Sequence, residues 1–163
     1  MTTICFRDGI LASDSLVSWC SEAGGGTKYE AIKLYRVTGQ LPGTNYGEYL
    51  VGIAGSVPAG QSFLEWLQKG GEPPESLVKD RAEADVLLVS KETGKAVVMD
   101  AAGAVMLENA PFYAIGSGRN PALAAMHAGK GAAEAVEIAC RIDLYSGGTL
   151  QVMQFETQAL PVA

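Results

Sequence analysis

Strand-like stretches lie at both ends of this chain and in its middle, and helix-like stretches interrupt them in only two places. The order along the sequence is strands, one helix, more strands, a pair of helices and a final strand. In an alternating parallel α/β fold, single strands and single helices follow one another in turn. This chain instead groups several strands together before each helical region. The pattern therefore predicts an α+β fold in which antiparallel sheets and helices pack in layers.

The strand predictions depend on apolar runs bounded by turn residues. TTICF and ILAS flank Asp8-Gly9, a dipeptide that favours the tight turn of an antiparallel hairpin. Later runs of the same character are AIKLYRV, YLVGIAG, DVLLVS, KAVVMD, FYAIGSG and TLQVMQFE. The stretch SEAGGGTKYE is polar and rich in glycine, which predicts a loop. The chain is thus expected to begin with a hairpin that this loop separates from the next strand.

Helical spacing appears from Pro58, which suits the first turn of a helix, and ends at Gly70-Gly71. The apolar residues of this segment are Phe63, Leu64, Trp66 and Leu67. Two alanine-rich stretches, at about 121–130 and 132–142, predict the helix pair. In the second, the apolar stripe at i, i+3, i+4 and i+7 consists of Ala135, Ile138, Ala139 and Ile142.

Composition excludes several classes of protein. The 163 residues include 12 basic and 18 acidic side chains, a net charge of −6 with no basic run, which argues against nucleic-acid binding. Cys5, Cys20 and Cys140 fit neither a disulfide framework nor a CxxC metal site. No apolar run approaches the roughly 18 residues of a membrane span, and no leader is evident. We therefore expect a soluble cytoplasmic protein with a single domain over 1–163 and no membrane association.

The threonine at position 2 directly follows the initiator methionine. Methionine is commonly removed when the next residue is small, and Thr2 would then carry a hydroxyl nucleophile and a free amine. A threonine hydroxyl needs a base, and its own amine can serve, because the reference pKa of an α-amine is about 7.7–8.0. A nearby cation would keep that amine neutral.

Two residues could supply such a charge pair. Lys33 lies in the apolar run AIKLYRV, and Asp14 ends the run ILAS. Each has a commoner structural explanation: a strand lysine usually lies at a sheet edge with its ammonium in water, and an aspartate after a strand usually belongs to a turn.

These residues and several further motifs occur in the order found in one family. TTIC, GILASDS, AIKLYRV, LVGIAGS, AIGSG and DLYSGG together resemble the proteasome β-type N-terminal nucleophile hydrolases, and particularly the bacterial peptidase subunit HslV. The resemblance covers nearly the whole chain. It implies a four-layer αββα sandwich with a catalytic set made of Thr2, Asp14, Lys33, Gly55, Ser117, Asp143 and Ser146.

The resemblance also implies a role for each residue. Thr2 would be the nucleophile, and Lys33, held by Asp14, would stabilise charge on its oxygen. The N–H of Gly55 would bind the oxyanion, a contact worth about 3–4 kcal/mol in comparable sites. Ile53 would face the first specificity pocket. Ser117, Asp143 and Ser146 would support the amine and hydroxyl of the nucleophile.

The expected cofactors and partners come from the same resemblance. Peptide hydrolysis of this type requires no cofactor, but a structural monovalent cation such as Na⁺ is expected on the backbone carbonyls of Cys140, Asp143 and Ser146. The substrates would be unfolded proteins or peptides. A homo-oligomeric double ring and an AAA+ ATPase unfoldase are the expected assembly and partner.

Parts of the sequence are also compatible with other functions. A catalytically silent subunit of a proteasome-like ring, acting as a scaffold, is the main alternative, although such subunits typically lose the threonine, aspartate or lysine. A related hydrolase acting on a small amide would use the same nucleophile. A Cys5–His127 pair has no acidic residue to orient the histidine, and GGGTK lacks the spacing of a phosphate-binding loop.

Overall fold

Two antiparallel sheets form the centre of the protein. The computed structural model describes residues 2–20, 26–72, 84–100, 103–106 and 110–156. The first sheet has the order β10 (Phe112–Gly116), β1 (Thr3–Arg7), β2 (Ile10–Ser13) and β11 (Gln151–Gln154). The second has the order β5 (Leu34–Gly39), β6 (Gly47–Gly55), β7 (Ala84–Ser90), β8 (Ala96–Asp100) and β9 (Gly103–Met106).

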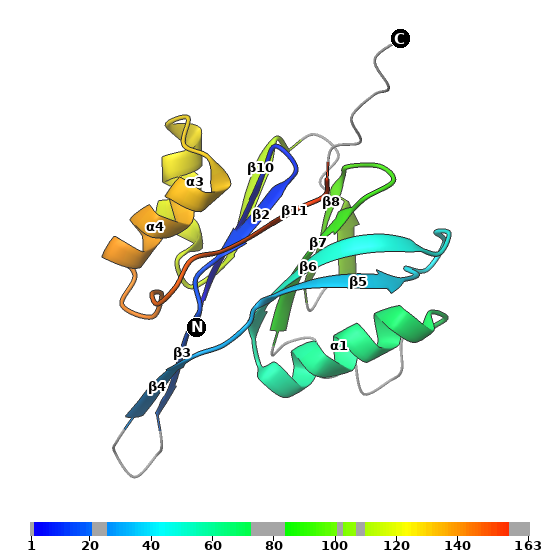
Figure 1. Cartoon of the computed structure of the whole chain (residues 1–163), viewed down its shortest axis with the longest axis horizontal. Coiled ribbons are helices and arrows are strands. Elements are labelled where there is room, and N and C mark those ends of the chain that lie inside the picture. Colours follow the sequence, from blue (N-terminus) through cyan, green and yellow to red (C-terminus); the bar gives the residue numbers. More distant parts are fainter. Residues whose placement is uncertain (1, 21–25, 73–83, 101–102, 107–109, 157–163) are drawn as a thin grey trace.

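Helices cover the outer faces of both sheets (Figure 1). Helix α1 (Val57–Lys69) lies against the five-stranded sheet, and α3 (Arg119–His127) and α4 (Ala132–Ile142) lie against the four-stranded sheet. The layers therefore follow one another as helices, sheet, sheet and helix. This arrangement confirms the predicted α+β fold and its four-layer αββα sandwich.

Alternate side chains along a strand belong to two different hydrophobic cores. On β1, Ile4 and Phe6 point into the core between the sheets, whereas Cys5 packs against the helix pair. On β6, Leu50 belongs to the core between the sheets and Val51 to the core beneath α1. Successive side chains of a strand point to opposite faces of its sheet. One short strand therefore contributes to the core on each side of that sheet.

The two outer cores differ in the size of their side chains. Beneath α1, Phe63 and Trp66 pack edge to face, with ring centroids 5.4 Å apart. Beneath the helix pair, the core is built mostly from alanines, so α3 and α4 approach the sheet closely. Those buried alanines are Ala12, Ala114, Ala122, Ala125, Ala132, Ala135 and Ala139.

The predicted N-terminal hairpin and the predicted helices are present, with small shifts at their ends. Asp8 and Gly9 both have positive φ, 52° and 76°, as a two-residue turn of the favoured type requires. Helix α1 begins at Val57, one residue before Pro58, because Ser56 caps it by accepting the Ala59 N–H at 3.4 Å. The structure adds β9, which the sequence pattern did not predict.

The prediction of a loop over SEAGGGTKYE is wrong for its second half. Residues 21–25 lie outside the described part of the chain, but β4 (Gly26–Glu30) is a strand that pairs with β3 (Leu16–Cys20). The partner strand LVSWC explains this, because an exposed polar strand forms when an adjacent strand satisfies its backbone. The hairpin extends away from the two larger sheets (Figure 1).

The apolar stripe predicted for α4 is correct for its alanines and wrong at its end. Ala135 and Ala139 are fully buried, but Ile142 is 64% exposed in the last turn of the helix. Among the helices that the structure describes, none is long and apolar enough to cross a bilayer.

Candidate active site

Thr2 directly precedes the first strand, β1, and is buried. Its side chain is 2% exposed, and its hydroxyl Oγ1 donates a hydrogen bond to Asp14 Oδ1 at 2.9 Å. Asp14 follows β2 directly, and β2 pairs with β1. The pairing of β1 with β2 therefore places the hydroxyl and the carboxylate side by side.

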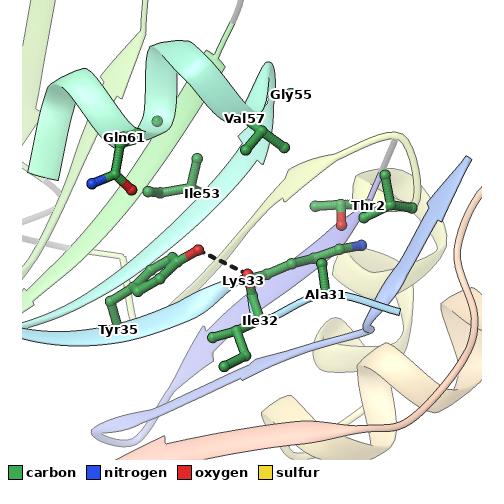
Figure 2. Close-up of a pocket in the computed structure, with 11 residues that line it drawn as sticks. Thr2, Ala31, Ile32, Lys33, Tyr35, Ile53, Gly55, Val57 and Gln61 are labelled. Atoms are coloured by element: carbon green, nitrogen blue, oxygen red, sulfur yellow. Dashed lines mark hydrogen bonds between the residues drawn. The ribbon is translucent and has the colours of Figure 1, made fainter. Parts of the chain in front are cut away.

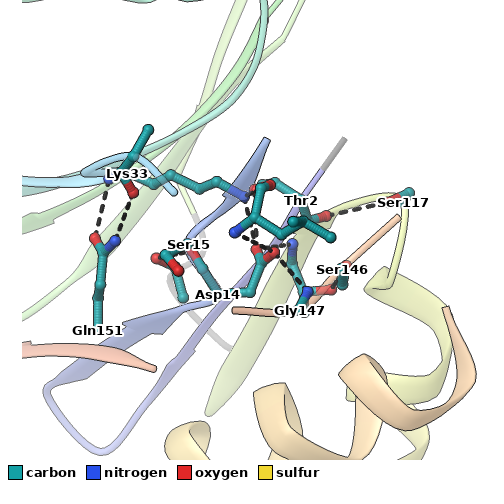
Figure 3. A network of polar contacts seen from close by, with 12 residues as sticks. Thr2, Asp14, Ser15, Lys33, Ser117, Ser146, Gly147 and Gln151 are labelled. Atoms are coloured by element: carbon teal, nitrogen blue, oxygen red, sulfur yellow. Dashed lines mark hydrogen bonds and ion pairs between the residues drawn. The ribbon is translucent and has the colours of Figure 1, made fainter. Parts of the chain in front are cut away.

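Asp14 accepts hydrogen bonds from five groups although its side chain is almost completely buried (Figure 3). The donors to Oδ1 are Thr2 Oγ1, the Thr3 N–H and Lys33 Nζ, each at 2.9 Å. The donors to Oδ2 are the N–H groups of Leu16 at 3.2 Å and Gly147 at 2.9 Å. All five partners are donors, so both carboxylate oxygens serve here as acceptors.

Lys33 supplies the positive charge of the site. Its ammonium donates to Asp14 Oδ1 at 2.9 Å and to the Leu16 carbonyl at 2.6 Å, and the residue is 7% exposed. Burial lowers the pKa of Lys33 below its ordinary value, and the charge of Asp14 opposes that shift. The structure therefore excludes the alternative of an edge-strand lysine with its ammonium in water. Likewise Asp14 belongs to the buried network and not merely to a turn.

A second carboxylate lies on the other side of Thr2. Asp143 Oδ2 accepts hydrogen bonds from Ser117 Oγ and Ser146 Oγ, both at 2.6 Å. Ser146 Oγ also lies 2.7 Å from Thr3 Oγ1, and Ser117 Oγ lies 3.4 Å from the Thr2 carbonyl. Burial raises the pKa of Asp143, but hydrogen bonds from the two serines and from the backbone of Tyr145 outweigh it and lower the pKa overall.

Two glycines let the AIGSG turn approach the first threonines. Gly116 has a φ of 93°, and a β-carbon there would overlap the carbonyl oxygen of Thr2. A β-carbon on Gly118 would overlap Thr3 Oγ1. Side chains at either position would push the turn away, and Ser117 between them would lose its place beside Thr2.

A pocket of about 390 Å³ opens beside Thr2 and Lys33 (Figure 2). Ile53 and Gly55, from the end of β6, line it together with α1. Gly55 has a φ of 112°, in the region that favours glycine. The remaining apolar lining residues include Val17, Ile32, Tyr35 and Val57. The structure thus places Ile53 and Gly55 at one cavity with the two residues predicted to act on the substrate.

The carbonyls predicted to bind a monovalent cation lie at the end of α4. Cys140 is in its last turns, and the Asp143 carbonyl accepts the Ser146 N–H at 3.3 Å. The negative end of a helix favours a cation. Within the described residues, no three His, Cys, Asp or Glu side chains are grouped as metal ligands. Backbone ligation by Na⁺ stays a prediction.

The geometry excludes a cysteine–histidine pair. Cys5 is buried beneath the helix pair, where burial raises the pKa of its thiol to about 12. His127 is exposed and packs edge to face on Phe112, with ring centroids 4.8 Å apart. A thiol that stays protonated at neutral pH is a poor nucleophile.

Sequence reasoning missed residues that act through their backbone. The N–H groups of Thr3, Leu16 and Gly147 bind Asp14, and the Leu16 carbonyl binds Lys33. Gly147 belongs to the DLYSGG motif, so the sequence could have pointed to it. Leu16 belongs to no such motif, and its backbone contacts would be possible with almost any side chain at that position.

Comparisons with known proteins agree on the fold. HslV from Trypanosoma brucei superposes with a TM-score of 0.65 and 25% identity, over 93% of this chain and 97% of that one. The protein BPH of Thiobacillus denitrificans, in complex with epoxomicin, gives 0.66 and 24%, over 96% and 99%. Anbu from Yersinia bercovieri gives 0.64 and 16%, over 95% and 82%. No family model matches the sequence, and no curated protein does.

The chain therefore has the HslV-like, proteasome-type N-terminal nucleophile hydrolase fold, as its motifs predicted.

Proposed function

We propose that this protein is the threonine-type endopeptidase subunit of a self-compartmentalising, HslV-like or proteasome-like protease. The observation that carries the proposal is that the Thr2 hydroxyl and the Lys33 ammonium both bind Asp14 Oδ1, each at 2.9 Å, beside an apolar pocket. A buried lysine and a buried aspartate cost stability, so their presence beside a hydroxyl argues for chemistry.

The reaction begins after Met1 has been removed. The free amine of Thr2 accepts the hydroxyl proton, directly or through a water, and Oγ1 attacks the peptide carbonyl. The backbone N–H of Gly55 stabilises the oxyanion of the tetrahedral intermediate. The protonated amine then gives its proton to the leaving amine, which departs as the new N-terminus. An ester on Thr2 remains, and water activated by the same amine hydrolyses it.

The charges around Thr2 prepare its two functional groups. The Lys33 ammonium stabilises negative charge that develops on Oγ1, and it discourages protonation of the amine. On the other side, Asp143 is held in its charged form by Ser117 and Ser146. In the proposed mature chain this carboxylate and its two hydroxyls orient the amine. Asp14 keeps Lys33 protonated and in place.

The pocket suggests the kind of substrate. Its walls are mainly apolar, and the residues that line them include Ile53, Val57, Val17 and Ile32. An apolar side chain on the acyl side of the cleaved bond fits such walls, and the carbonyl that follows it would then lie near Thr2 and Gly55. Unfolded proteins and peptides expose side chains of this kind.

Assembly into a homo-oligomeric double ring belongs to the same proposal, with cytoplasmic location and an AAA+ ATPase unfoldase as partner. A peptidase that accepts unfolded chains endangers its host unless its site is enclosed. Native mass measurement of the purified protein should give a multiple of the subunit mass. Monomer alone at micromolar concentration would contradict the ring.

The decisive experiment is intact mass measurement before and after incubation with epoxomicin, a peptide epoxyketone that reacts with both the hydroxyl and the amine of an N-terminal threonine. We expect a chain that lacks Met1 and gains the mass of one inhibitor. Thr2→Ala should take up none, whereas Thr2→Ser keeps a hydroxyl and an amine and should still react.

Two other outcomes would lead to the alternatives. A chain that retains Met1 and takes up no inhibitor would be a silent ring subunit, because the amine would stand one residue away from the hydroxyl. A chain that is labelled but does not cleave unfolded casein would be a hydrolase of a different amide.

A further inference from the structure

The segment that carries Lys33 lies outside the strands. Residues 31–33 connect β4 to β5, and the strand-like run predicted to begin at Ala31 becomes a strand only at Leu34. A connecting segment of this kind is usually mobile, yet Lys33 must reach Asp14 with its ammonium. Contacts beyond the ends of the strands must therefore hold this part of the backbone, and one of them is the hydrogen bond from the Ala31 N–H to the Ser15 carbonyl at 2.9 Å.

The side chain of Gln151 binds this backbone at two points (Figure 3). Its amide nitrogen Nε2 donates to the Ala31 carbonyl at 2.6 Å, and its oxygen Oε1 accepts the Lys33 N–H at 3.0 Å. From the other sheet, the Ile53 N–H donates to the Lys33 carbonyl at 3.1 Å. The backbone of Lys33 is thus fixed to β11 on one side and to β6 on the other.

Gln151 is itself fixed relative to Asp14. It stands on β11 opposite Ser13 of β2, and Ser13 is the residue before Asp14. One pair of strands therefore carries both the carboxylate and the group that holds the lysine backbone.

A second contact holds the start of the same segment. Glu30 Oε1 accepts from Ser15 Oγ at 3.0 Å and from the Thr149 N–H at 2.7 Å. Thr149 Oγ1 also donates to this carboxylate, at 3.0 Å. Ser15 adjoins Asp14, and Thr149 lies two residues after Gly147, whose N–H binds Asp14. The last residue of β4 is thereby tied to the loop that completes the carboxylate site.

We propose that Gln151 is a positioning residue of this site, which sets the backbone of Lys33 so that its ammonium meets Asp14, with Glu30 as a second anchor. The effect on catalysis rests on the proposed threonine peptidase function. The effect on the position of Lys33 does not.

The chemistry of the amide explains why glutamine suits this position. A carboxamide offers a donor and an acceptor at once, as the neighbouring strand would with its N–H and C=O. A glutamate can accept the Lys33 N–H but has no donor for the Ala31 carbonyl. An alanine can do neither, and both backbone groups would be left to water.

The test compares Gln151→Ala and Gln151→Glu with Gln154→Ala, a control on the same strand whose glutamine is exposed. We expect Gln151→Ala to lower kcat for peptide hydrolysis by about 10- to 100-fold with little change in KM, as misplaced catalytic groups do. Gln151→Glu should fall between Gln151→Ala and the wild type. Gln154→Ala should stay within about twofold of the wild type, in line with an exposed substitution.

A second readout follows the lysine directly. Nitrogen-15 NMR of the Lys33 ammonium should give a higher pKa in Gln151→Ala than in the wild type, because a loosened segment lets water reach the charge. The alkaline limb of the activity profile should move in the same direction. A purely structural glutamine would lower the unfolding temperature and leave both the pKa and the kcat of the folded enzyme unchanged, and that result would overturn the proposal.

Hydrogen exchange in the wild-type protein removes any dependence on how well the variants fold. The Lys33 amide should exchange slowly, as a strand amide does, although it lies in a connecting segment. Fast exchange at Lys33 would also overturn the proposal. If the wild type is neither labelled nor active, the peptidase function fails, while the ammonium pKa and the exchange rate still test the role of Gln151.

Discussion

Two neighbouring parts of the β1–β2 hairpin are equally buried and differ completely in chemistry. In the polar part, Thr2 and Asp14 are 2% and 1% exposed, and hydrogen bonds satisfy them. A few residues along the same strands, Ile4 and Leu11 are fully buried in the core between the sheets. Apolar burial stabilises the fold, whereas the polar part consumes some of that stability to hold charged groups where they can act.

The largest loss should come from removing the centre of the polar part. Asp14→Ala deprives Lys33 of its carboxylate and leaves the N–H groups of Thr3, Leu16 and Gly147 without an acceptor. We expect the free energy of unfolding in urea to fall by about 3–5 kcal/mol, with epoxomicin labelling lost. Asp14→Asn keeps one acceptor oxygen, so it should lose less stability and still lose labelling. Wild-type stability of Asp14→Ala would contradict the network.

In the apolar part of the hairpin, a substitution should lower stability and leave activity unchanged. Leu11→Ala leaves a cavity between the sheets and should lower the free energy of unfolding by about 2–5 kcal/mol. Because Leu11 contacts none of the site groups, the rate of epoxomicin labelling of the folded protein should stay near that of the wild type. A labelling rate that drops as far as that of Asp14→Ala would show that the polar and apolar parts are not independent.

A smaller effect is expected at the turn beside Thr2. Gly116→Ala combines a positive φ with a β-carbon that overlaps the Thr2 carbonyl, so it should cost about 1–3 kcal/mol and slow labelling as well. Gly9→Ala is the matched control. Its φ is also positive, at 76°, but no atom lies within 4 Å of the added β-carbon. Gly9→Ala should lose some stability and keep the wild-type labelling rate.

The subtlest prediction concerns pH. Labelling requires the Thr2 amine in its neutral form and Lys33 in its ammonium form, so its rate should rise through the amine pKa and fall when Lys33 loses its proton. Because burial lowers the pKa of Lys33 below its ordinary 10.5, that fall should begin at a lower pH than an exposed lysine would give. Tryptophan fluorescence at the same pH checks that the protein is still folded. A rate that stays constant beyond pH 10.5 would contradict this role of Lys33.

Local patterns were enough to predict most of the architecture. The Asp8-Gly9 turn, the helical spacing that ends at Gly70 and the alanine-rich pair α3 and α4 are all written within short windows of sequence. The loop prediction failed over β4 because its residues are polar and exposed, and only pairing with β3 makes them a strand. Strands of this kind are determined by a neighbour, which a local pattern does not include.

The sequence motifs predicted the side chains of the site but not the backbone contacts that hold them in place. Thr2, Asp14, Lys33 and Ser146 stand in recognisable motifs, and the structure brings them together. The contacts of Gln151 with residues 31–33 join parts of the chain about 120 positions apart and involve backbone atoms, so no spacing in the sequence reveals them.

The donors to Asp14 come from both ends of the sequence, and this has a consequence for the newly made chain. During synthesis the N-terminal hairpin leaves the ribosome first and already contains Thr2 and the Asp14 carboxylate. Gly147, which provides the last N–H to that carboxylate, emerges only after α4 has been made. A nascent chain that has reached only α4 thus carries an incomplete site, and translation itself delays the appearance of the site until the sandwich can close.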